Sequence, residues 1–492
     1  MTLPAPSIAS LLDGHSDAPV VAWGGVTLNR RRLRRMVDAL ARTLEGHPGE
    51  PVAVIAPNVP AVIVGLFAVW RAGGVAVPLN TRLRHYELEH ILRDAQPWAI
   101  VSLSAHAGFD VATVVQQLAP EIPTLALHVV TDELGNTIAE HRHPTGIGCE
   151  ELDAEAATIL YTSGTTGEPK GAIERHSKGL SVARSFGEVL GPHADEPCAY
   201  IVPVSHCFGL ACLLATVGAG SLAVLVDVPG SLAPLLEAMR DHRVGVLHGS
   251  PALFSAVLRG ADELPAWRSG FIAGSACPPE LVAALDRRGA RMLGQYGLTE
   301  IGNVTACRLD DPSETRHHTV GRSLGGYEVR AVPVPDADQD EIQVRSAFLW
   351  PSLFRRAWSS AELTDDGWLR TGDLGTIDAN GNVTIAGRSK HVVHTAGFSV
   401  HPAEVEGFLQ TYPGVVSAVV VGIPHPELGE ALAAYVVITP GTSLDRRNFM
   451  RFCRAGIAGY KVPNRVEVVR ELPLLASGKP DRAALTRDAQ AL

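Results

Sequence analysis

YTSGTTGEPKG, at residues 161–171, is the stretch that decides how this chain of 492 residues is interpreted. It follows an apolar run at residues 157–160, which predicts a buried strand. Its glycines let the backbone approach an anion closely, its Ser and Thr hydroxyls can donate to phosphate oxygens, and Lys170 adds a positive charge. It is not a Walker A loop, because the G-x-x-x-x-G-K-[ST] spacing is absent. The stretch therefore predicts an anion-binding loop after a strand, with a plain surface turn as the alternative.

Around this loop, short apolar runs alternate with helical patterns. The expected strands lie at residues 51–56, 75–78, 99–102, 244–247 and 270–273, with helices at 59–71 and 86–95. Strands that alternate with helices of this length predict βαβ crossovers and mostly parallel sheets. We therefore expect an α/β protein with more than one sheet.

The texture of the sequence changes from about Asn382 onward. Strand-like runs occur at residues 383–386, 416–421 and 433–437, with helical stretches at 402–409 and 444–457. A tail of about one hundred residues is large enough for its own α+β domain. We predict a large multi-sheet domain at residues 1–387 and a small domain at 388–492, with the polar segment 387–390 as the boundary.

Composition limits the classes of protein that fit. The length predicts two or more domains, and the formal net charge of -10 argues against a nucleic-acid partner. The seven cysteines form no C-x-x-C pair and lie mostly among apolar residues, which is typical of reduced thiols rather than of disulfides or a zinc site. The first twenty residues lack the features of a signal peptide. These observations favour a cytoplasmic protein.

Two segments allow competing interpretations. Residues 208–226 carry no charge and are long enough to span a bilayer, but Gly218 and Gly220 divide them into a helical half and a β-branched half. We expect a buried helix followed by a buried strand, and no membrane span. Residues 27–44 are expected to form an amphipathic helix with the arginines at 30, 31, 32, 34 and 35 on the wet face, and phosphate binding is the alternative.

The loop at residues 161–171 resembles the signature phosphate loop of the adenylate-forming (AMP-binding) superfamily, which includes acyl-CoA synthetases. Further matches follow in the family's order: QYGLTE at 295–300, GWLRTGDL at 367–374, GRSK at 387–390, TAGFSVHPAEVE at 395–406 and LPLLASGKPDR at 472–482. The resemblance covers the chain from Thr27 to Arg482. It places the chain in the acyl-CoA synthetase branch and implies a large adenylation domain with a small, mobile C-terminal lid.

The resemblance also implies roles for residues around the nucleotide. Phosphate contacts would come from Thr162, Ser163, Gly164, Thr165, Thr166, Gly167 and Lys170. The adenine pocket would be formed by Gly274, Ser275, Ala276 and the ring of Tyr296, while Asp373 would bind the ribose hydroxyls and Arg388 would contact the nucleotide. The residues implied for catalysis are Thr299 on a phosphate oxygen, Glu300 on Mg²⁺ and the mobile Lys479.

Other residues are implied on the acyl and acceptor sides. Gly397 and Phe398 would line a tunnel for the pantetheine arm of coenzyme A, and Lys390 would be the hinge. The acyl pocket would include His206, Gly297 and Ile301, although His206 could equally be a structural histidine. No acidic residue lies between Tyr200 and Val226, which argues against an amino-acid substrate and favours a hydrophobic or aromatic acid.

The implied reaction has two steps. A carboxylate attacks the α-phosphate of ATP with Mg²⁺ present, and coenzyme A then captures the acyl-AMP. His391, His394 and PSLFRR at residues 351–356 depart from the family pattern and bear on the hinge and on thioester formation. The alternatives are a carrier-protein thiol as acceptor, an enzyme of one half-reaction, or a non-catalytic nucleotide-binding protein, against which Lys479, Glu300 and Asp373 speak. A monomer and a homodimer are both open.

Overall fold

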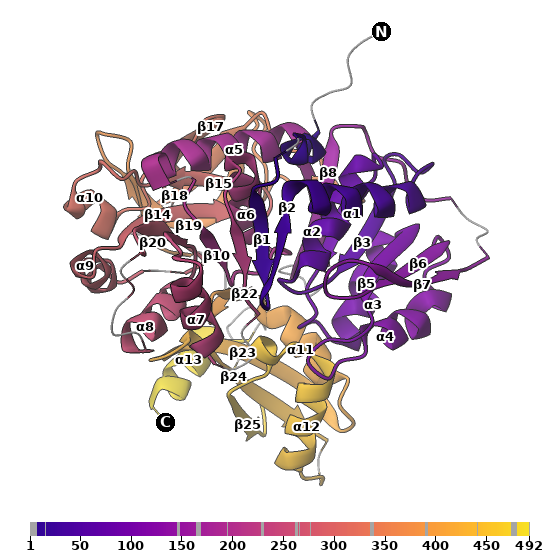
Figure 1. The fold of residues 1–492 in the computed structure, drawn as a ribbon. Helices are drawn as coiled ribbons and strands as arrows, with labels where there is room; N and C mark the ends of the chain where they lie inside the picture. Colours follow the sequence, from indigo (N-terminus) through magenta and orange to yellow (C-terminus); the bar gives the residue numbers. More distant parts are fainter. Residues whose placement is uncertain are drawn as a thin grey trace.

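The structure is a computed structural model. It describes residues 7–14, 16–144, 148–163, 169–193, 195–227, 231–260, 264, 266–275, 277–334, 339–388, 392–439, 441–473 and 480–491. Four sheets organise these residues (Figure 1). The mixed α/β architecture confirms the predicted fold class.

A sheet of seven strands contains the expected βαβ units. Its order is β7 (Thr137–Arg142), β6 (Leu127–Thr131), β5 (Ala99–Leu103), β3 (Pro51–Ile55), β4 (Val75–Leu79), β8 (Ala156–Ser163) and β9 (Pro169–Arg175). The central strands run parallel and β7 and β9 are antiparallel edges. Strands β3 to β6 are buried along their whole length, which explains why they read as continuous apolar runs. The YTSGTTGEPKG stretch thus connects two antiparallel neighbours, β8 and β9.

Helices of this first unit are α1 (Arg30–Thr43), α2 (Pro60–Arg71), α3 (His85–Ala95) and α4 (Val111–Leu118). Helix α2 is buried on all sides from Pro60 to Trp70, as expected of an apolar helix packed in a shared core. Helix α1 begins after Asn29, whose side chain accepts from the Arg32 N–H. One expectation for α1 is wrong: Arg30 is only 8% exposed, and its guanidinium donates to the Leu11 and Val217 carbonyls at 2.7 and 3.2 Å. Because Arg30 lies in the first turn of the helix, its side chain is covered by the segments that carry Leu11 and Val217 and does not face solvent.

The second large sheet has nine strands. Its order is β16 (Arg322–Ser323), β15 (Gly302–Ala306), β14 (Arg291–Leu298), β13 (Ser269–Ile272), β12 (Val246–Leu247), β10 (Cys198–Tyr200), β11 (Ala223–Leu225), β1 (Pro19–Trp23) and β2 (Val26–Asn29). Its helices are α5 (His176–Leu190), α6 (Cys207–Ala219), α7 (Ala233–Asp241), α8 (Pro251–Gly260), α9 (Pro279–Arg287) and α10 (Ser313–His318).

The uncharged segment 208–226 folds as predicted. It forms α6 and then β11, and Gly220 ends the helix in the left-handed region with φ 75°. Glycine is favoured there because it carries no Cβ. In the part of the chain that the structure describes, no helix is both long and apolar enough to cross a membrane.

A small antiparallel sheet carries the predicted ribose-binding segment. It consists of β17 (Tyr327–Val332), β18 (Asp340–Ser346), β19 (Leu369–Ile377) and β20 (Val383–Arg388). The run at residues 383–386, predicted as a strand, forms β20 and pairs with β19. A strand pattern reports burial and alternation but does not identify the neighbouring strand.

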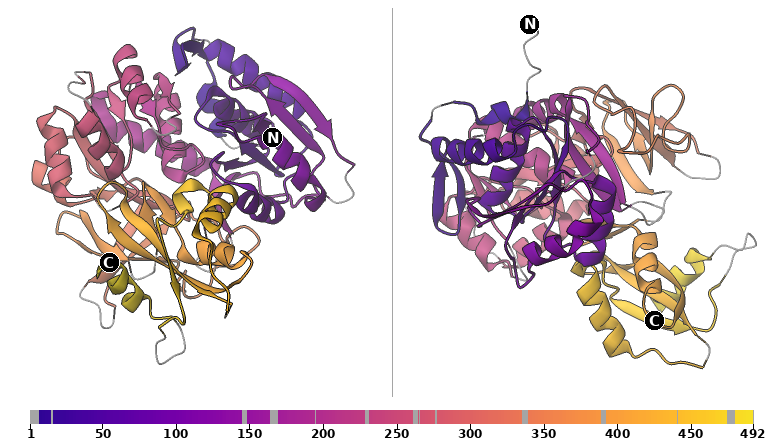
Figure 2. Two further views of the ribbon diagram at one scale, coloured as in Figure 1. Left: turned by 90° about the horizontal axis from the view of Figure 1, so that it is seen from below. Right: turned by 90° about the vertical axis from the view of Figure 1, so that its right-hand side faces the viewer.

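The remaining sheet lies at one end of the molecule, where Figure 2 shows it in orange and yellow. Its strands are β22 (Phe398–Val400), β21 (Val393–Thr395), β24 (Gly429–Ile438) and β23 (Val415–His425), with β25 (Arg465–Val469) on β24. Three helices accompany it: α11 (Pro402–Gln410), α12 (Arg446–Gly456) and α13 (Arg482–Ala491). These elements, which we call the C-terminal unit, have their own hydrophobic cluster. The division at residues 387 and 388 stays a prediction.

Candidate active site

A cavity of about 940 Å³ lies between the large sheets and the C-terminal unit. Eleven predicted site residues line it: Lys170, His206, Gly274, Ser275, Tyr296, Gly297, Thr299, Glu300, Asp373, Gly397 and Phe398. They come from strands of all four sheets and from the loops next to them. The fold therefore gathers residues that are more than two hundred positions apart in the sequence.

Tyr296 and Asp373 meet across two sheets. Tyr296 lies on β14 and donates its hydroxyl to Asp373 Oδ2 on β19 at 2.6 Å. Gly372 precedes the aspartate in the left-handed region with φ 71°, which lets the strand turn its carboxylate toward the cavity. The predicted adenine-stacking ring and the predicted ribose ligand are thus held together as one unit.

The hairpin between β14 and β15 presents Thr299 and Glu300. Strand β14 reaches the turn through Gly297, where an added Cβ would lie 2.2 Å from the Gly302 carbonyl oxygen. Only glycine allows this close approach of the two strands. Ile301, predicted in the acyl pocket, is 1% exposed and packs in the main core rather than lining the cavity.

Glu300 fits a magnesium site that is shared with the substrate. The described residues hold no group of three His, Cys, Asp or Glu side chains arranged around a cation. At sites that contain substrate phosphates, Mg²⁺ is usually bound by one or two carboxylates together with those phosphates. The Glu300 carboxylate on the cavity wall is consistent with that arrangement.

Lys170 reaches the cavity from β9 and pairs with Glu362, with Nζ 3.2 Å from Oε1. Burial acts to raise the pKa of Glu362, but hydrogen bonds from Arg356 and Ser359 and the charge of Lys170 outweigh it, and the pKa falls below its ordinary value. Glu362 is therefore held as a carboxylate beside Lys170.

On the acceptor side, the C-terminal unit closes against the nucleotide side of the cavity. A Cβ on Gly274 would lie 3.3 Å from the Gly397 carbonyl oxygen, and a Cβ on Gly397 would lie 2.8 Å from Ser250 Cβ. The Phe398 ring stacks on Tyr460 at 4.1 Å between centroids. The close approach of Gly397 to Gly274 brings the predicted pantetheine loop to the predicted adenine turn.

Several predicted residues are not placed. Gly164, Thr165, Thr166, Gly167, Ala276, Lys390 and Lys479 lie outside the described residues, as does His391. For Thr162, Ser163 and Arg388, the structure describes only the backbone, in β8 and β20. The roles implied for these residues stay predictions.

Comparison with known proteins decides the family. The profile described as AMP-binding enzyme matches residues 10–346, and the profile of the AMP-binding enzyme C-terminal domain matches residues 404–479. The chain belongs to the AMP-binding enzyme family. The predicted adenylate-forming, acyl-CoA synthetase branch is confirmed.

Relatives and solved structures cover nearly the whole AMP-binding enzyme. The chain is 33% identical to 3-[(3aS,4S,7aS)-7a-methyl-1,5-dioxo-octahydro-1H-inden-4-yl]propanoyl:CoA ligase of Rhodococcus jostii, covering 94% of each protein. It is 30% identical to a feruloyl-CoA synthase of Amycolatopsis, again with 94% of each covered. The structure of amide bond synthetase McbA from Marinactinospora thermotolerans superposes with a TM-score of 0.84 at 26% identity, covering 99% of this chain and 100% of that one. A malonyl-CoA ligase complex with methylmalonyl-CoA and AMP gives a TM-score of 0.79 at 27% identity, covering 95% and 99%.

The AMP-binding enzyme also contains a cysteine–histidine pair that the sequence did not single out. His206 caps α6 by accepting the Phe208 N–H at 3.3 Å, and its Nδ1 lies 3.7 Å from the sulfur of Cys207. Thr299 donates to the same sulfur at 3.8 Å. Burial acts to raise the pKa of Cys207, but His206 outweighs it and lowers the pKa below its ordinary value. Burial acts to lower the pKa of His206, which the Cys207 sulfur reverses.

Arg356 is a second residue of the AMP-binding enzyme that sequence reasoning missed. It donates to both oxygens of Glu362, at 3.0 and 2.7 Å, and thereby holds the carboxylate that faces Lys170. Arg356 belongs to PSLFRR, the segment that departs from the family pattern. In the sequence, the indication of a special role was that the charged residue Arg356 ends the segment that differs from the family pattern.

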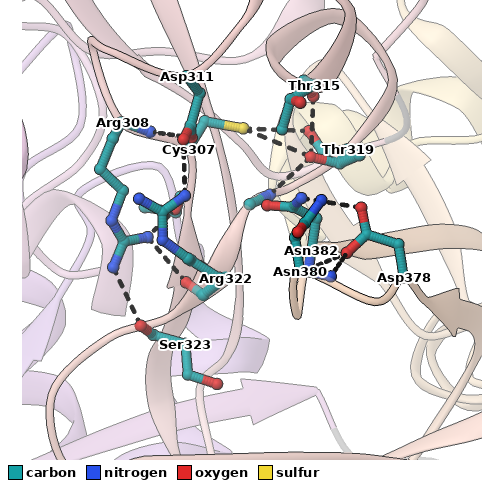
Figure 3. A network of polar contacts seen from close by, with 12 residues as sticks. Cys307, Arg308, Asp311, Thr315, Thr319, Arg322, Ser323, Asp378, Asn380 and Asn382 are labelled. Carbon is teal, nitrogen blue, oxygen red and sulfur yellow. Dashed lines mark hydrogen bonds and ion pairs between the residues drawn. The ribbon is translucent and has the colours of Figure 1, made fainter.

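The polar network in Figure 3 lies where the small antiparallel sheet meets the nine-stranded sheet. Arg308 donates to the Arg322 and Ser323 carbonyls at 2.9 and 3.0 Å, and Arg322 pairs with Asp311 at 2.6 Å. Beside it, Asp378 accepts from the backbone and side chain of Asn382. Backbone bonds between residues 320–321 and 383 join the two groups and attach the small sheet to the nine-stranded sheet. Asp373 is thereby fixed relative to Tyr296.

Proposed function

We propose that this AMP-forming acyl-CoA synthetase acts on a hydrophobic or aromatic carboxylic acid. The proposal rests on the composition of one cavity wall. His206, Cys207 and Phe208 line this wall, and the whole segment 200–226 lacks an acidic side chain. An amino group on the substrate would find no carboxylate from this segment, whereas an apolar chain or ring would be desolvated there. The ring-bearing acids in the names of two relatives support the same class.

The first step joins the acid to AMP. The substrate carboxylate attacks the α-phosphorus of ATP, a P–O bond forms, and pyrophosphate leaves. Lys170 and Thr299 would contact phosphate oxygens, while Tyr296 and Asp373 would hold the nucleoside so that the α-phosphate faces the acid. Glu300 would hold Mg²⁺ together with the phosphates, and the ion would supply charge neutralisation. Lys479 is proposed from the resemblance as the lysine that bridges the carboxylate and the α-phosphate.

The second step transfers the acyl group to coenzyme A. The thiolate attacks the carbonyl carbon of acyl-AMP, the C–S bond forms, and AMP leaves with the electrons of the C–O bond. Gly397 and Phe398 would guide the pantetheine arm, because their loop lies against Gly274 at the cavity. A carrier-protein phosphopantetheine presents the same thiol and is the second candidate acceptor.

ATP–pyrophosphate exchange over a panel of aromatic, alicyclic, fatty and amino acids tests the proposal, with each reaction repeated in the presence of coenzyme A. We expect exchange with hydrophobic acids, no exchange with α-amino acids, and AMP and thioester formed together once coenzyme A is added. Exchange confined to amino acids or short dicarboxylic acids would refute the proposed substrate class. Exchange without thioester would move the acceptor to a carrier protein.

Lys479→Ala is the matched control for that assay. Removal of a charge that stabilises the transition state costs about 10²–10³ in rate. Exchange should fall by that amount, while transfer from supplied acyl-AMP to coenzyme A should persist. Equal loss of both steps would contradict the role proposed for Lys479.

A further inference from the structure

A buried charged cluster joins the C-terminal unit to the large sheets. Lys461 Nζ lies 2.9 Å from Glu87 Oε1 and 2.5 Å from Glu404 Oε1. Glu87 belongs to α3, whereas Lys461 and Glu404 belong to the C-terminal unit. The side chains of Glu87 and Lys461 are only 1% and 6% exposed. The cluster therefore crosses the interface between the two parts with both charges out of water.

Backbone groups from both parts complete the coordination of Glu87. The Ala458 N–H donates to its two carboxylate oxygens at 3.2 and 3.0 Å, and the Arg84 N–H donates to Oε2 at 2.7 Å. Burial acts to lower the pKa of Lys461, but the charges of Glu404 and Glu87 outweigh it and raise the pKa above its ordinary value. The lysine thus remains a cation inside the interface.

Such a cluster stabilises one arrangement of the two parts. A buried ion pair is favourable only when its partners meet, because each charge alone would lose its hydration. The rings around it are also paired across the interface: Tyr86 contacts Phe408 edge-on at 5.1 Å between centroids, and Arg82 lies 5.5 Å from the Phe398 ring centre. All of these contacts would break together if the C-terminal unit rotated away.

The arrangement that the cluster holds is the one in which Gly397 reaches the cavity. The loop at Gly397 packs against Gly274 and Ser250 in the same structure in which Lys461 contacts Glu87. We propose that Glu87 and Lys461 are positioning residues for acyl transfer, and that their ion pair holds the pantetheine loop at the cavity during the second step. This inference rests on the proposed two-step reaction and adds residues that lie outside its nucleotide and acyl contacts.

The expected consequence is a split between the two half-reactions. A contact made in only one of two arrangements shifts the population toward that arrangement. Loss of the pair lowers the population competent for transfer and does not change the contacts made in the alternative arrangement. General damage to the fold would instead lower both steps.

Glu87→Gln tests the inference, because the amide keeps the size and an acceptor for Ala458 but removes the charge. We expect ATP–pyrophosphate exchange within about twofold of the wild type. Single-turnover transfer from enzyme-bound acyl-AMP to coenzyme A should slow by about tenfold or more. Glu328→Gln is the control, since Glu328 pairs with Arg345 at 2.6 Å on the exposed small sheet, and it should change neither step.

Lys461→Gln removes the other charge of the ion pair and should have the same effect: transfer to coenzyme A slows while ATP–pyrophosphate exchange is retained. Unchanged transfer in both folded variants would overturn the inference, as would a parallel fall of exchange and transfer. A wild-type enzyme that shows no exchange with any acid would instead refute the proposed function. The two failures are therefore distinguishable.

Discussion

The hydroxyl of Tyr296 donates to Asp373 Oδ2 at 2.6 Å and joins the nine-stranded sheet to the small antiparallel sheet inside the cavity. The two residues are 77 positions apart in the chain. The resemblance implies that Tyr296 stacks on the adenine and that Asp373 binds the ribose of the same nucleotide. The hydrogen bond would therefore orient the Asp373 carboxylate relative to the Tyr296 ring.

Tyr296→Phe should therefore weaken ATP binding while leaving the ring in place. A hydrogen bond to a charged group contributes about 1.5–3 kcal/mol, which corresponds to a rise in KM for ATP of about tenfold or more. We expect kcat to change less than KM, because the nucleotide still reaches the same position when it is bound. Initial rates over a range of ATP concentrations give both constants. Tyr327→Phe is the control, since its buried hydroxyl donates to the Ile301 carbonyl at 3.1 Å; an equal effect of both variants would contradict the prediction.

Cys207 should be the most reactive thiol of the protein. His206 lowers its pKa despite burial, and α6 begins at this residue, whereas burial raises the pKa of each of the other six cysteines. Because its pKa is lowered, a larger fraction of Cys207 is thiolate at a given pH than in an ordinary thiol, and this fraction falls as the pH drops through the lowered pKa. Iodoacetamide labelling followed by mass spectrometry should show Cys207 modified first, with protection by the acid and ATP.

Cys277 provides the comparison within the same cavity. It also lines the wall, but burial raises its pKa to about 12. We expect its labelling to be slower than that of Cys207, and His206→Ala should remove the difference. Preferential labelling of Cys277 in the wild type would refute the pairing of Cys207 with His206.

Gly397→Ala should impair transfer to coenzyme A beyond any effect on stability. Gly397 has φ +86°, and an added Cβ would lie 2.8 Å from Ser250 Cβ, so the loop would have to move away from the cavity. Gly381 has nearly the same φ, +81°, but no atom within 4 Å of an added Cβ. Both substitutions should cost about 1–2 kcal/mol for the left-handed backbone, measured by denaturant unfolding. Only Gly397→Ala should slow thioester formation, and a normal rate in that variant would contradict the packing of the loop.

Arg30→Ala should destabilise the protein although Arg30 lies in a run of arginines. Its guanidinium donates to two carbonyls, and the substitution leaves the buried Leu11 and Val217 acceptors without this donor and also removes the packed stem. We expect a loss of about 2 kcal/mol in the free energy of unfolding. Arg31→Ala should change it by less than about 1 kcal/mol, because the ion pair of Arg31 with Asp17 is more than half exposed on both sides. Equal shifts in Tm would show that the buried contacts of Arg30 contribute nothing.

The sequence alone predicted the local elements and the family. Strands β3, β4 and β5 were predicted because strands buried on both faces read as continuous apolar runs, and α6 followed by β11 was predicted because glycines separate the two halves of residues 208–226. The resemblance of the motifs between residues 161 and 482 to the adenylate-forming superfamily implied which side chains belong to one site.

Only the tertiary structure decided which segments meet. The strand at residues 383–388 pairs with β19, and Arg30 is buried against the segments that carry Leu11 and Val217. Lys461 and Glu87 are 374 positions apart and have no local pattern that links them, because periodicity reports how each element faces the core but not which element covers it. The charge of a buried side chain is tolerated only beside its partner, and that partner is set by the packing of sheets and helices.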